Sequence, residues 1–248
     1  MHTNLDNQNP SQQVTPGLLG ARCRDCSLQE LCLPLGLSQE EMERVDELVS
    51  QRKRAGRGEA LYHSEDLFDA IYSVRHGFFR TDVLLEDGHS YITGFYMTGE
   101  IIGMDGISTG KYSCSAVALE DSEVCVIPYQ RLETLACEVR SLQQHIHRIM
   151  SREIVRDQSM MLLLGSMSSG ERLAAFLLNL SERFDARGHS PVNFHLRMTR
   201  EEIGRYLGLK IETISRTFTR FQEEGLMEVR HKHVRLLDVP RLRHLIRQ

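Results

Sequence analysis

The sequence from residue 199 to 225, TREEIGRYLGLKIETISRTFTRFQEEG, predicts two helices joined by a tight turn. Thr199 is followed three residues later by Glu202, which is the spacing of a capping box at a helix start. Gly208 stands at the turn, where a residue without Cβ can adopt a positive φ and let two helices approach closely. A second helix is predicted over about residues 211–224. The pattern is typical of a helix-turn-helix, in which the second helix reads DNA bases.

This second helix separates an apolar stripe from a polar face. The apolar residues at helical spacing are Ile211, Ile214, Phe218 and Phe221. The polar face carries Glu212, Ser215, Arg216 and Thr219. In the major groove Glu can accept from cytosine, Arg can donate two bonds to guanine, and Ser or Thr can bind either kind of base. Lys210 occupies the cap position, where Ser, Thr or Asp is preferred, and we expect it to contact a phosphate.

A solvated surface helix would also carry charges on one face. The capping box, the turn glycine and the separation of the two faces together favour a DNA-reading helix over that alternative.

The distribution of charge along the chain agrees with a DNA-reading helix. The 248 residues have a formal net charge of −4, but residues 197–248 hold 12 Lys and Arg against 7 Asp and Glu, and the remainder of the chain carries −9. The basic part is therefore the part that would contact phosphates.

The length and composition of the chain, and its lack of a long apolar run, predict a cytoplasmic protein of two domains. A length of 248 residues and 41% hydrophobic content are ordinary for a globular chain of that kind. No apolar run approaches the roughly 20 residues of a membrane span, and the polar N-terminus has no signal-peptide core. In a reducing compartment, the six cysteines are expected to be ligands, redox groups or buried thiols rather than disulfides.

Three cysteines cluster near the N-terminus, after a polar stretch over residues 1–20 that we expect to be a flexible arm. Cys23, Cys26 and Cys32 form a C-x2-C-x5-C pattern, close enough to converge on one inorganic centre. Three thiolates are one short of the four that tetrahedral zinc or an iron–sulfur cluster usually takes, so a fourth ligand must come from elsewhere. From these residues alone zinc, a cluster and metal-free thiols all remain open.

Between residues 58 and 128 the pattern changes to short strands separated by glycine turns. Gly77, Gly88, Gly99 and Gly110 recur at intervals of 11, which suits a strand-and-turn β-roll. A long helix then follows over about residues 139–164.

That helix carries a stripe with 3-4 spacing, which predicts a seam against a partner helix. The stripe consists of Leu142, Ile146, Ile149, Glu153, Asp157, Met160 and Leu164. The alternative is that the stripe packs on the chain's own barrel. Ile154 and Asp157 favour a subunit interface, because a carboxylate facing its twin across a two-fold axis would weaken the pair and make it switchable.

Residues 21–238 resemble the CRP/FNR family of bacterial transcription regulators, most closely at E-T-I-S-R over residues 212–216 and in the cysteine triplet. The branch it is most similar to is the FNR-type (fumarate and nitrate reduction regulator), which senses oxygen. In that branch the residues matching Glu212, Ser215 and Arg216 contact a TTGAT-like half-site. The resemblance also implies that Cys125, in SEVCVIPYQRL, joins the triplet as the fourth ligand of a [4Fe–4S] cluster. Cys114 and Cys137 have no counterpart in this pattern and are expected to be buried.

The fold implied by this resemblance is α+β. It has an N-terminal β-roll sensor of the cyclic-nucleotide-binding type, a long dimerisation helix and a C-terminal winged helix-turn-helix. The expected boundaries are residues 1–20 for the arm, 21–138 for the cysteine segment and sensor, 139–165 for the helix, and 166–248 for the DNA-binding domain.

Nucleotide-binding members of the family keep a Gly-Glu for the ribose and an Arg-Ser for the cyclic phosphate. Here Gly99 and Glu100 are present, but Cys114 stands in the place of the Arg before Ser115. The phosphate would lose its bidentate partner, so nucleotide sensing is disfavoured and Glu100 is expected to be a turn residue.

The sequence is thus interpreted as that of an oxygen-responsive transcription regulator, not an enzyme. An intact cluster would promote a homodimer through Ile146, Ile149, Ile154, Asp157 and Met160. That dimer would bind a palindromic operator, and RNA polymerase is a partner expected from the family. One alternative is a regulator of the same family that senses nitric oxide or a small effector, with zinc or no metal. Another is an iron–sulfur electron carrier or enzyme, although no nucleophile–base arrangement, phosphate loop or acid pair supports it.

Overall fold

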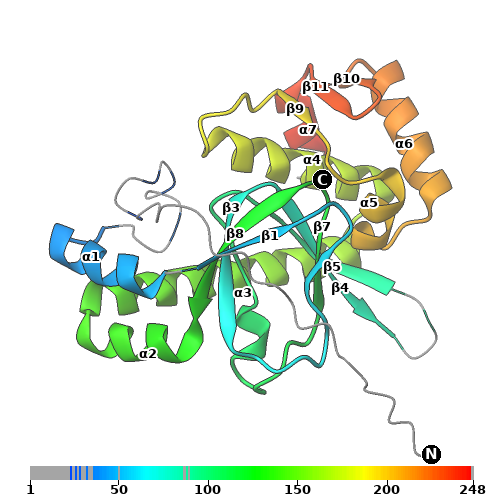
Figure 1. Cartoon of the computed structure of the whole chain (residues 1–248). Coiled ribbons are helices and arrows are strands. Elements are labelled where there is room, and N and C mark those ends of the chain that lie inside the picture. Colours follow the sequence, from blue (N-terminus) through cyan, green and yellow to red (C-terminus); the bar gives the residue numbers. More distant parts are fainter. Residues whose placement is uncertain are drawn as a thin grey trace, which may run out of the picture.

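The computed structural model describes residues 23, 26, 28, 32, 36–49, 51–85, 88 and 90–246. The arm expected over residues 1–20 lies outside the described residues. Figure 1 shows a β-roll flanked by helices and a C-terminal helical domain that packs above it. The α+β class and the order of sensor, long helix and helix-turn-helix are confirmed.

Two four-stranded antiparallel sheets form the β-roll, in the strand orders β1-β8-β3-β6 and β2-β7-β4-β5. The strands are β1 (Gln51–Ala55), β2 (Ala60–Tyr62), β3 (Ala70–His76), β4 (Phe78–Leu84), β5 (Ser90–Met97), β6 (Ile101–Ile102), β7 (Ser115–Ala118) and β8 (Ser122–Pro128). The four glycines spaced by 11 all lie in connections outside the strands and have a positive φ, between 73° and 95°, a conformation that disfavours other residues. A short 3-10 turn, η2 (Met104–Gly106), follows β6.

Three helices cover the outer face of the first sheet. They are α1 (Gln39–Leu48), α2 (Tyr129–Glu138) and the N-terminal part of α3 (Arg140–Ser166). Helix α1 begins with a capping box, in which the Ser38 hydroxyl accepts from the backbone N–H of Glu41 and the Glu41 carboxylate accepts from the backbone N–H of Ser38. Cys23 and Cys32 pack against the same apolar cluster, which α1, α2, α3 and the first sheet form.

The C-terminal domain has four helices and a three-stranded sheet of order β10-β11-β9. Its elements are α4 (Ser169–Asp185), β9 (Asn193–His195), α5 (Arg200–Leu207), α6 (Ile211–Glu223), β10 (Met227–Arg230), β11 (His233–Leu236) and α7 (Val239–Leu245). The predicted helix pair and the two-stranded wing are present. Strand β9 was not predicted, because three residues are too few for a periodic signal.

The two domains share one apolar core. Phe78, Phe95 and Met97, from β4 and β5, belong to the same buried cluster as Phe176 of α4 and Ile203 of α5. The C-terminal domain is therefore docked on the outer face of the second sheet, as Figure 1 shows for α4 and α5. Among the described residues, no helix is both long and apolar enough to cross a bilayer.

Candidate functional site

All four cysteines of the expected ligand set line one small pocket. Cys23, Cys26, Cys32 and Cys125 surround it together with four aliphatic side chains, Ser73 and Arg75. We call this the cysteine pocket. Cys125 lies in the middle of the first sheet, opposite Ser73 on β3, and the Cys32 thiol lies 2.9 Å from the Ser73 hydroxyl. Segments about 90 residues apart in the chain thus bring their thiols to one place.

The surroundings of these thiols are apolar but include cations. Burial raises the pKa of the Cys23 thiol well above its ordinary value, and nearby Cys32, Asp46 and Cys125 raise it further. Burial also raises the pKa of Cys125, but Arg75 and Arg52 act in the opposite direction and favour its thiolate. Arginines beside a set of thiolates offset the negative charge that such a set gathers on a bound metal centre.

The long helix α3 contacts the cysteine segment directly. His145 is 1% exposed, and its Nε2 atom lies 3.1 Å from the backbone carbonyl oxygen of Cys32. One turn earlier, the Ser141 hydroxyl donates to the Glu41 carboxylate of α1 at 2.7 Å. A displacement of the cysteine segment would therefore disturb the start of α3. Sequence reasoning missed His145, because a lone histidine on an apolar face gives no specific signal.

Helix α6 presents the predicted reading face to solvent. Glu212, Arg216 and Thr219 are exposed, Ser215 is half-buried, and Lys210 is exposed at the start of the helix. The Lys210 side chain makes no capping bond, as expected. In Figure 1 this helix and the β10–β11 wing lie at the outer edge of the C-terminal domain, whereas α4 and α5 face the β-roll.

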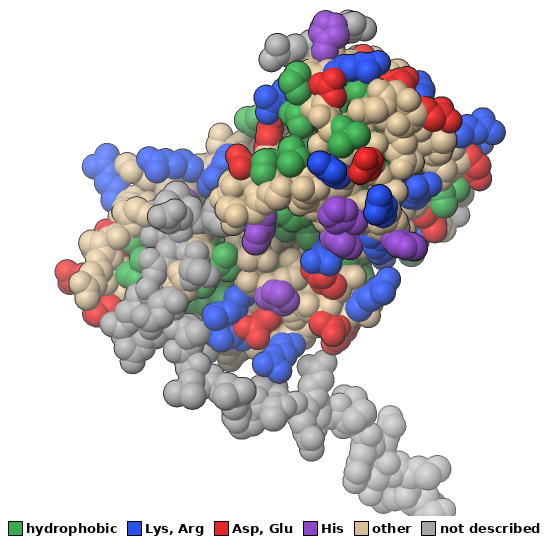
Figure 2. Space-filling model, turned by 90° about the horizontal axis from the view of Figure 1, so that it is seen from above, with side chains coloured by type: hydrophobic (Ala, Val, Ile, Leu, Met, Phe, Trp, Pro, Cys, Tyr) green, Lys and Arg blue, Asp and Glu red, His purple; other side chains and the backbone are tan. Residues whose placement is uncertain are grey.

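The apolar side of α6 explains this orientation. Ile214, Phe218 and Phe221 are at most 1% exposed and pack in the core of the domain. Figure 2 shows basic, acidic and histidine side chains interspersed on the face that it displays. Bulk charge therefore does not single out one binding surface on that face. Base contacts by these residues stay a prediction.

The angle between α5 and α6 depends on two glycines. Gly208 ends α5 with φ of 63°, as the sequence predicts for this turn. Gly204 is buried within α5, where an added Cβ would lie 2.6 Å from the backbone oxygen of Leu209. A backbone atom cannot move aside as a side chain does, so Gly204 holds the turn between the helices closed.

Replacing Gly204 with alanine is expected to lower the free energy of unfolding by about 1–3 kcal/mol, the usual cost of overpacking, although alanine favours helices. Urea unfolding followed by circular dichroism would measure it. Gly165→Ala is the matched control, because that helical glycine has nothing within 4 Å of an added Cβ. The control should be neutral or stabilised by up to about 1 kcal/mol. Equal stability of the two variants would show that the α5–α6 contact is not tight.

Helix α3 carries two neighbouring stripes, and the structure separates them. Ile146, Ile149 and Met160, which belong to the predicted seam, are half-buried against apolar clusters of their own chain. The exposed stripe is displaced around the helix and contains Met150, Ile154, Asp157, Met161 and Leu164. Ile154 is 57% exposed and Met161 is 71% exposed. The 3-4 spacing fits both stripes, so the sequence could not tell which one packs on the β-roll. Contact with a second copy stays a prediction.

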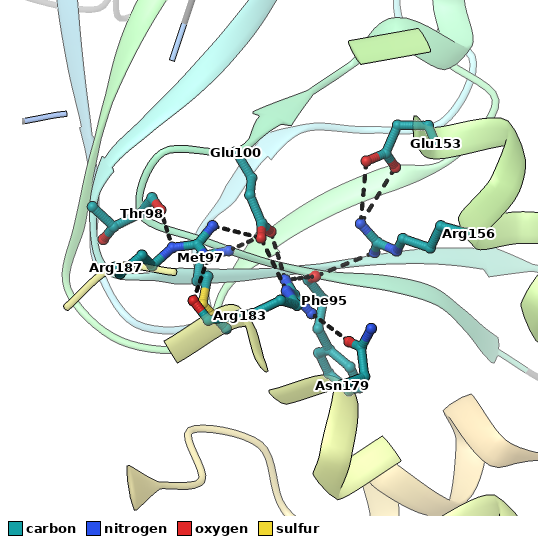
Figure 3. Close-up of polar contacts among 9 residues, drawn as sticks. All are labelled: Phe95, Met97, Thr98, Glu100, Glu153, Arg156, Asn179, Arg183 and Arg187. Carbon is teal, nitrogen blue, oxygen red and sulfur yellow. Dashed lines mark hydrogen bonds and ion pairs between the residues drawn. The ribbon is translucent and has the colours of Figure 1, made fainter. Parts of the chain in front are cut away.

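Glu100 is more than the turn residue that the sequence suggested. Its carboxylate accepts from the Met97 backbone at 3.0 Å, as a turn residue would, and also binds Arg183 of α4 and Arg187 in the turn that follows α4 (Figure 3). Burial tends to raise its pKa, but the two guanidinium groups outweigh that effect and hold the pKa below its ordinary value. A carboxylate so engaged is not available to a ribose. Cys114 is buried in the roll next to Asp105, which also differs from a nucleotide site.

Comparison with known proteins gives the same picture for both halves of the chain. Residues 52–137 match a family model described as a cyclic nucleotide-binding domain, and residues 171–245 match a Crp-like helix-turn-helix domain. Over 228 residues, the chain is 50% identical to the transcriptional regulatory protein btr of Bordetella pertussis, covering 92% of this chain and 94% of that protein.

Two further relatives are transcription regulators. The transcriptional activator protein anr of Pseudomonas aeruginosa is 47% identical over 218 residues, covering 88% of this chain and 89% of that protein. The fumarate and nitrate reduction regulatory protein of Escherichia coli is 40% identical over 223 residues, covering 90% and 89%. Among solved structures, FixK2 from Bradyrhizobium japonicum matches with a TM-score of 0.72 and 27% identity, over 79% of this chain and 96% of that one.

Proposed function

Because this chain belongs to the CRP/FNR family of transcription regulators, in its FNR-type branch, we propose that it is an oxygen-responsive regulator with a [4Fe–4S] cluster in the cysteine pocket. That it is a DNA-binding transcription regulator and not an enzyme follows from the family itself. The oxygen response and the cluster are the proposal. The convergence of four cysteine thiols on one pocket is the observation that carries it.

The donor set fits an iron–sulfur cluster. Four thiolates with apolar walls are the usual surroundings of such a cluster, and Arg75 and Arg52 supply compensating positive charge. A single tetrahedral zinc ion would need sulfur atoms about 3.8 Å apart, given its bond length to thiolate. Among the described residues, no three His, Cys, Asp or Glu side chains converge closely enough to hold one metal ion. In a four-iron cluster each thiolate binds a different iron atom, so the four sulfur atoms need not converge on one point.

When bound, the cluster would supply an oxygen-labile tie between the N-terminal segment and the β-roll. The chain's own contacts indicate how that tie reaches α3. The buried His145 imidazole bonds the backbone carbonyl oxygen of Cys32. Because a carbonyl oxygen can only accept, the Nε2–H of His145 is the donor. Release of the cysteine segment would remove this bond and expose the buried start of α3.

The exposed stripe of α3 is the surface we propose for the homodimer. It is apolar except for Asp157, and two copies of that carboxylate would approach each other across the two-fold axis. The dimer is thereby kept weak enough for the cysteine pocket to control it. Two α6 helices, one helical turn apart, would then bind a TTGAT-like palindrome with an affinity that a monomer cannot reach. RNA polymerase is the further partner expected of this family.

Replacing Asp157 with alanine is expected to tighten the dimer about tenfold or more and to permit operator binding in air, because the like-charge repulsion disappears. Sedimentation velocity and fluorescence anisotropy on air-exposed protein would measure both effects. Gln158→Ala, an exposed uncharged neighbour, is the control and should stay monomeric. A monomeric Asp157→Ala variant would contradict the proposed interface.

The test of the cluster itself is a visible absorption spectrum with iron and sulfide analysis on protein purified without oxygen. About four iron and four sulfide per chain, with absorption that decays in air, are expected. One zinc per chain, or no metal, would favour the alternative regulator that senses nitric oxide or a small effector. Sequence-selective binding to the palindrome separates both regulators from an electron carrier.

A further inference from the structure

Glu100 joins the two domains through a nearly saturated set of bonds. Arg183 binds its carboxylate as a fork, with Nε donating to Oε1 at 2.9 Å and Nη2 to Oε2 at 2.5 Å. Arg187 adds a bond from Nη2 to Oε1 at 2.7 Å. The side chains of Glu100, Arg183 and Arg187 are only 18%, 16% and 9% exposed. Two-point pairing between planar groups fixes orientation as well as distance.

The same arginines also bind the backbone of the β-roll, as Figure 3 shows. Arg183 donates to the carbonyl oxygen of Phe95 at 2.7 Å, and Arg187 donates to that of Thr98 at 2.6 Å. Arg156 of α3 reaches the Phe95 oxygen from the other side, at 3.2 Å. Strand β5 and its following turn are therefore held by α3 and α4 together. Below these bonds, the Phe95 ring lies 5.0 Å from the ring of Tyr206 in α5.

Docking in this arrangement leaves the DNA-binding surface open. It covers α4 and α5, while Glu212, Arg216 and Thr219 of α6 remain exposed. The docked orientation is thus compatible with base contacts. In a dimer it would also determine where the two α6 helices lie, because each is carried by a domain that is fixed to its own β-roll.

We propose that Glu100 is a positioning residue for DNA recognition: by holding Arg183 and Arg187 it sets the orientation of the DNA-binding domain and hence the half-site spacing that the dimer accepts. This inference rests on the proposed homodimer. Without the Glu100 charge, two largely buried guanidinium groups would lack a counter-ion and would favour solvent, which loosens the docking. A loosened domain can follow half-sites at several separations, so it loses its preference for one of them.

The experiment compares the wild-type chain with Glu100→Gln, which keeps the size of the side chain and an oxygen for the Met97 amide. Oxygen-free full-length protein is titrated onto palindromes with the natural half-site separation and with one base pair added or removed. One base pair rotates a half-site by about 35°, so the wild type should prefer the natural separation by about tenfold or more. The preference of Glu100→Gln should fall below about threefold. A ratio of two affinities from one preparation is not affected by a partly unfolded fraction.

Glu120→Gln is the matched control, because Glu120 also pairs with an arginine across the domain junction, Arg197 at 3.2 Å, but both side chains are at least 30% exposed. It should keep the wild-type spacing preference, since exposed pairs contribute little. Arg187→Gln tests the contact from the other side and should behave as Glu100→Gln does. It also provides the readout if Glu100→Gln fails to fold.

Hydrogen–deuterium exchange on metal-free protein measures the docking without relying on a cluster or a dimer. Faster exchange in β5 and at the end of α4 is expected for Glu100→Gln and not for Glu120→Gln. Unchanged exchange in Glu100→Gln would overturn the inference. So would loosened docking with an unchanged spacing preference. If the wild-type protein binds no iron but the exchange results are as expected, that outcome counts against the proposed oxygen sensor and not against the role of Glu100 in docking.

Discussion

Replacing Cys125 with serine is expected to abolish iron binding and to weaken operator binding in the absence of oxygen by about 100-fold or more. Cys125 is the one pocket cysteine held within a sheet, paired to Arg52 on β1 and Ser73 on β3. The other three lie near one another in the N-terminal segment. Without the Cys125 thiolate, a cluster would have no ligand on the β-roll, so the segment would no longer be tied to it. The dimer would be lost, and with it the gain from two half-sites.

Serine is nearly the same size as cysteine, so this substitution should leave the fold intact. Iron analysis, sedimentation velocity and anisotropy with an operator duplex, all performed without oxygen, measure the three consequences. Cys137→Ser is the matched control, because Cys137 is exposed on α2 and does not line the cysteine pocket. It was expected from the sequence to be buried, and the structure shows that this expectation was wrong. A Cys125→Ser protein that retains about four iron atoms per chain would remove Cys125 from the ligand set.

Replacing Arg216 with alanine is expected to remove most of the discrimination between operator and random DNA. A guanidinium bound to both acceptors of a guanine contributes about 1–3 kcal/mol of specificity, and a dimer makes the contact twice. The loss is therefore about 2–6 kcal/mol, or roughly 30-fold to 20,000-fold in the specificity ratio. Binding to random DNA should change little, because that affinity comes mainly from phosphate contacts.

Competition titrations at one salt concentration measure the ratio. Arg243→Ala is the control, since Arg243 is an exposed arginine of the same domain, on α7, paired with Glu182 at 3.7 Å. It changes the charge equally but leaves the reading face of α6 intact, so its specificity ratio should be that of the wild type. Lys210→Ala should instead weaken binding to all sequences by a similar factor. An unchanged ratio in Arg216→Ala would mean that Arg216 does not read a base.

Features that depend on residues close together in the chain were predicted correctly, because their causes lie within a few neighbouring residues. The capping box predicted at Thr199 involves residues three apart, and it is present. The glycines spaced by 11 each have a positive φ, and the bare N-terminus of α6 at Lys210 lacks a side-chain cap as expected. Each of these features depends on sterics and hydrogen bonds among near neighbours in the chain. Such features therefore do not depend on how the rest of the chain folds.

Features that depend on distant segments were incomplete or wrong. The sequence placed Ile146 and Met160 on a partner-facing seam, but both are half-buried against apolar clusters of their own chain. It treated Glu100 only as part of a turn, although Arg183 of α4 and Arg187, just beyond the end of α4, bind it from more than 80 residues away. A weak signal was available, since Arg183 and Arg187 stand four residues apart where an otherwise amphipathic helix ends. Their partner was not identifiable until the domains were placed.

The amino-acid sequence by itself determined the helix-turn-helix, the glycine-turned roll, the basic C-terminal part and the family resemblance. Periodicity, capping and residue chemistry are properties of short segments, and they persist in any fold that contains those segments. Only the tertiary structure decided which stripe of α3 is exposed and that Glu100 binds two arginines of the C-terminal domain. These outcomes depend on which surfaces the rest of the chain brings opposite one another, and burial and ion pairing respond to that arrangement rather than to distance along the sequence.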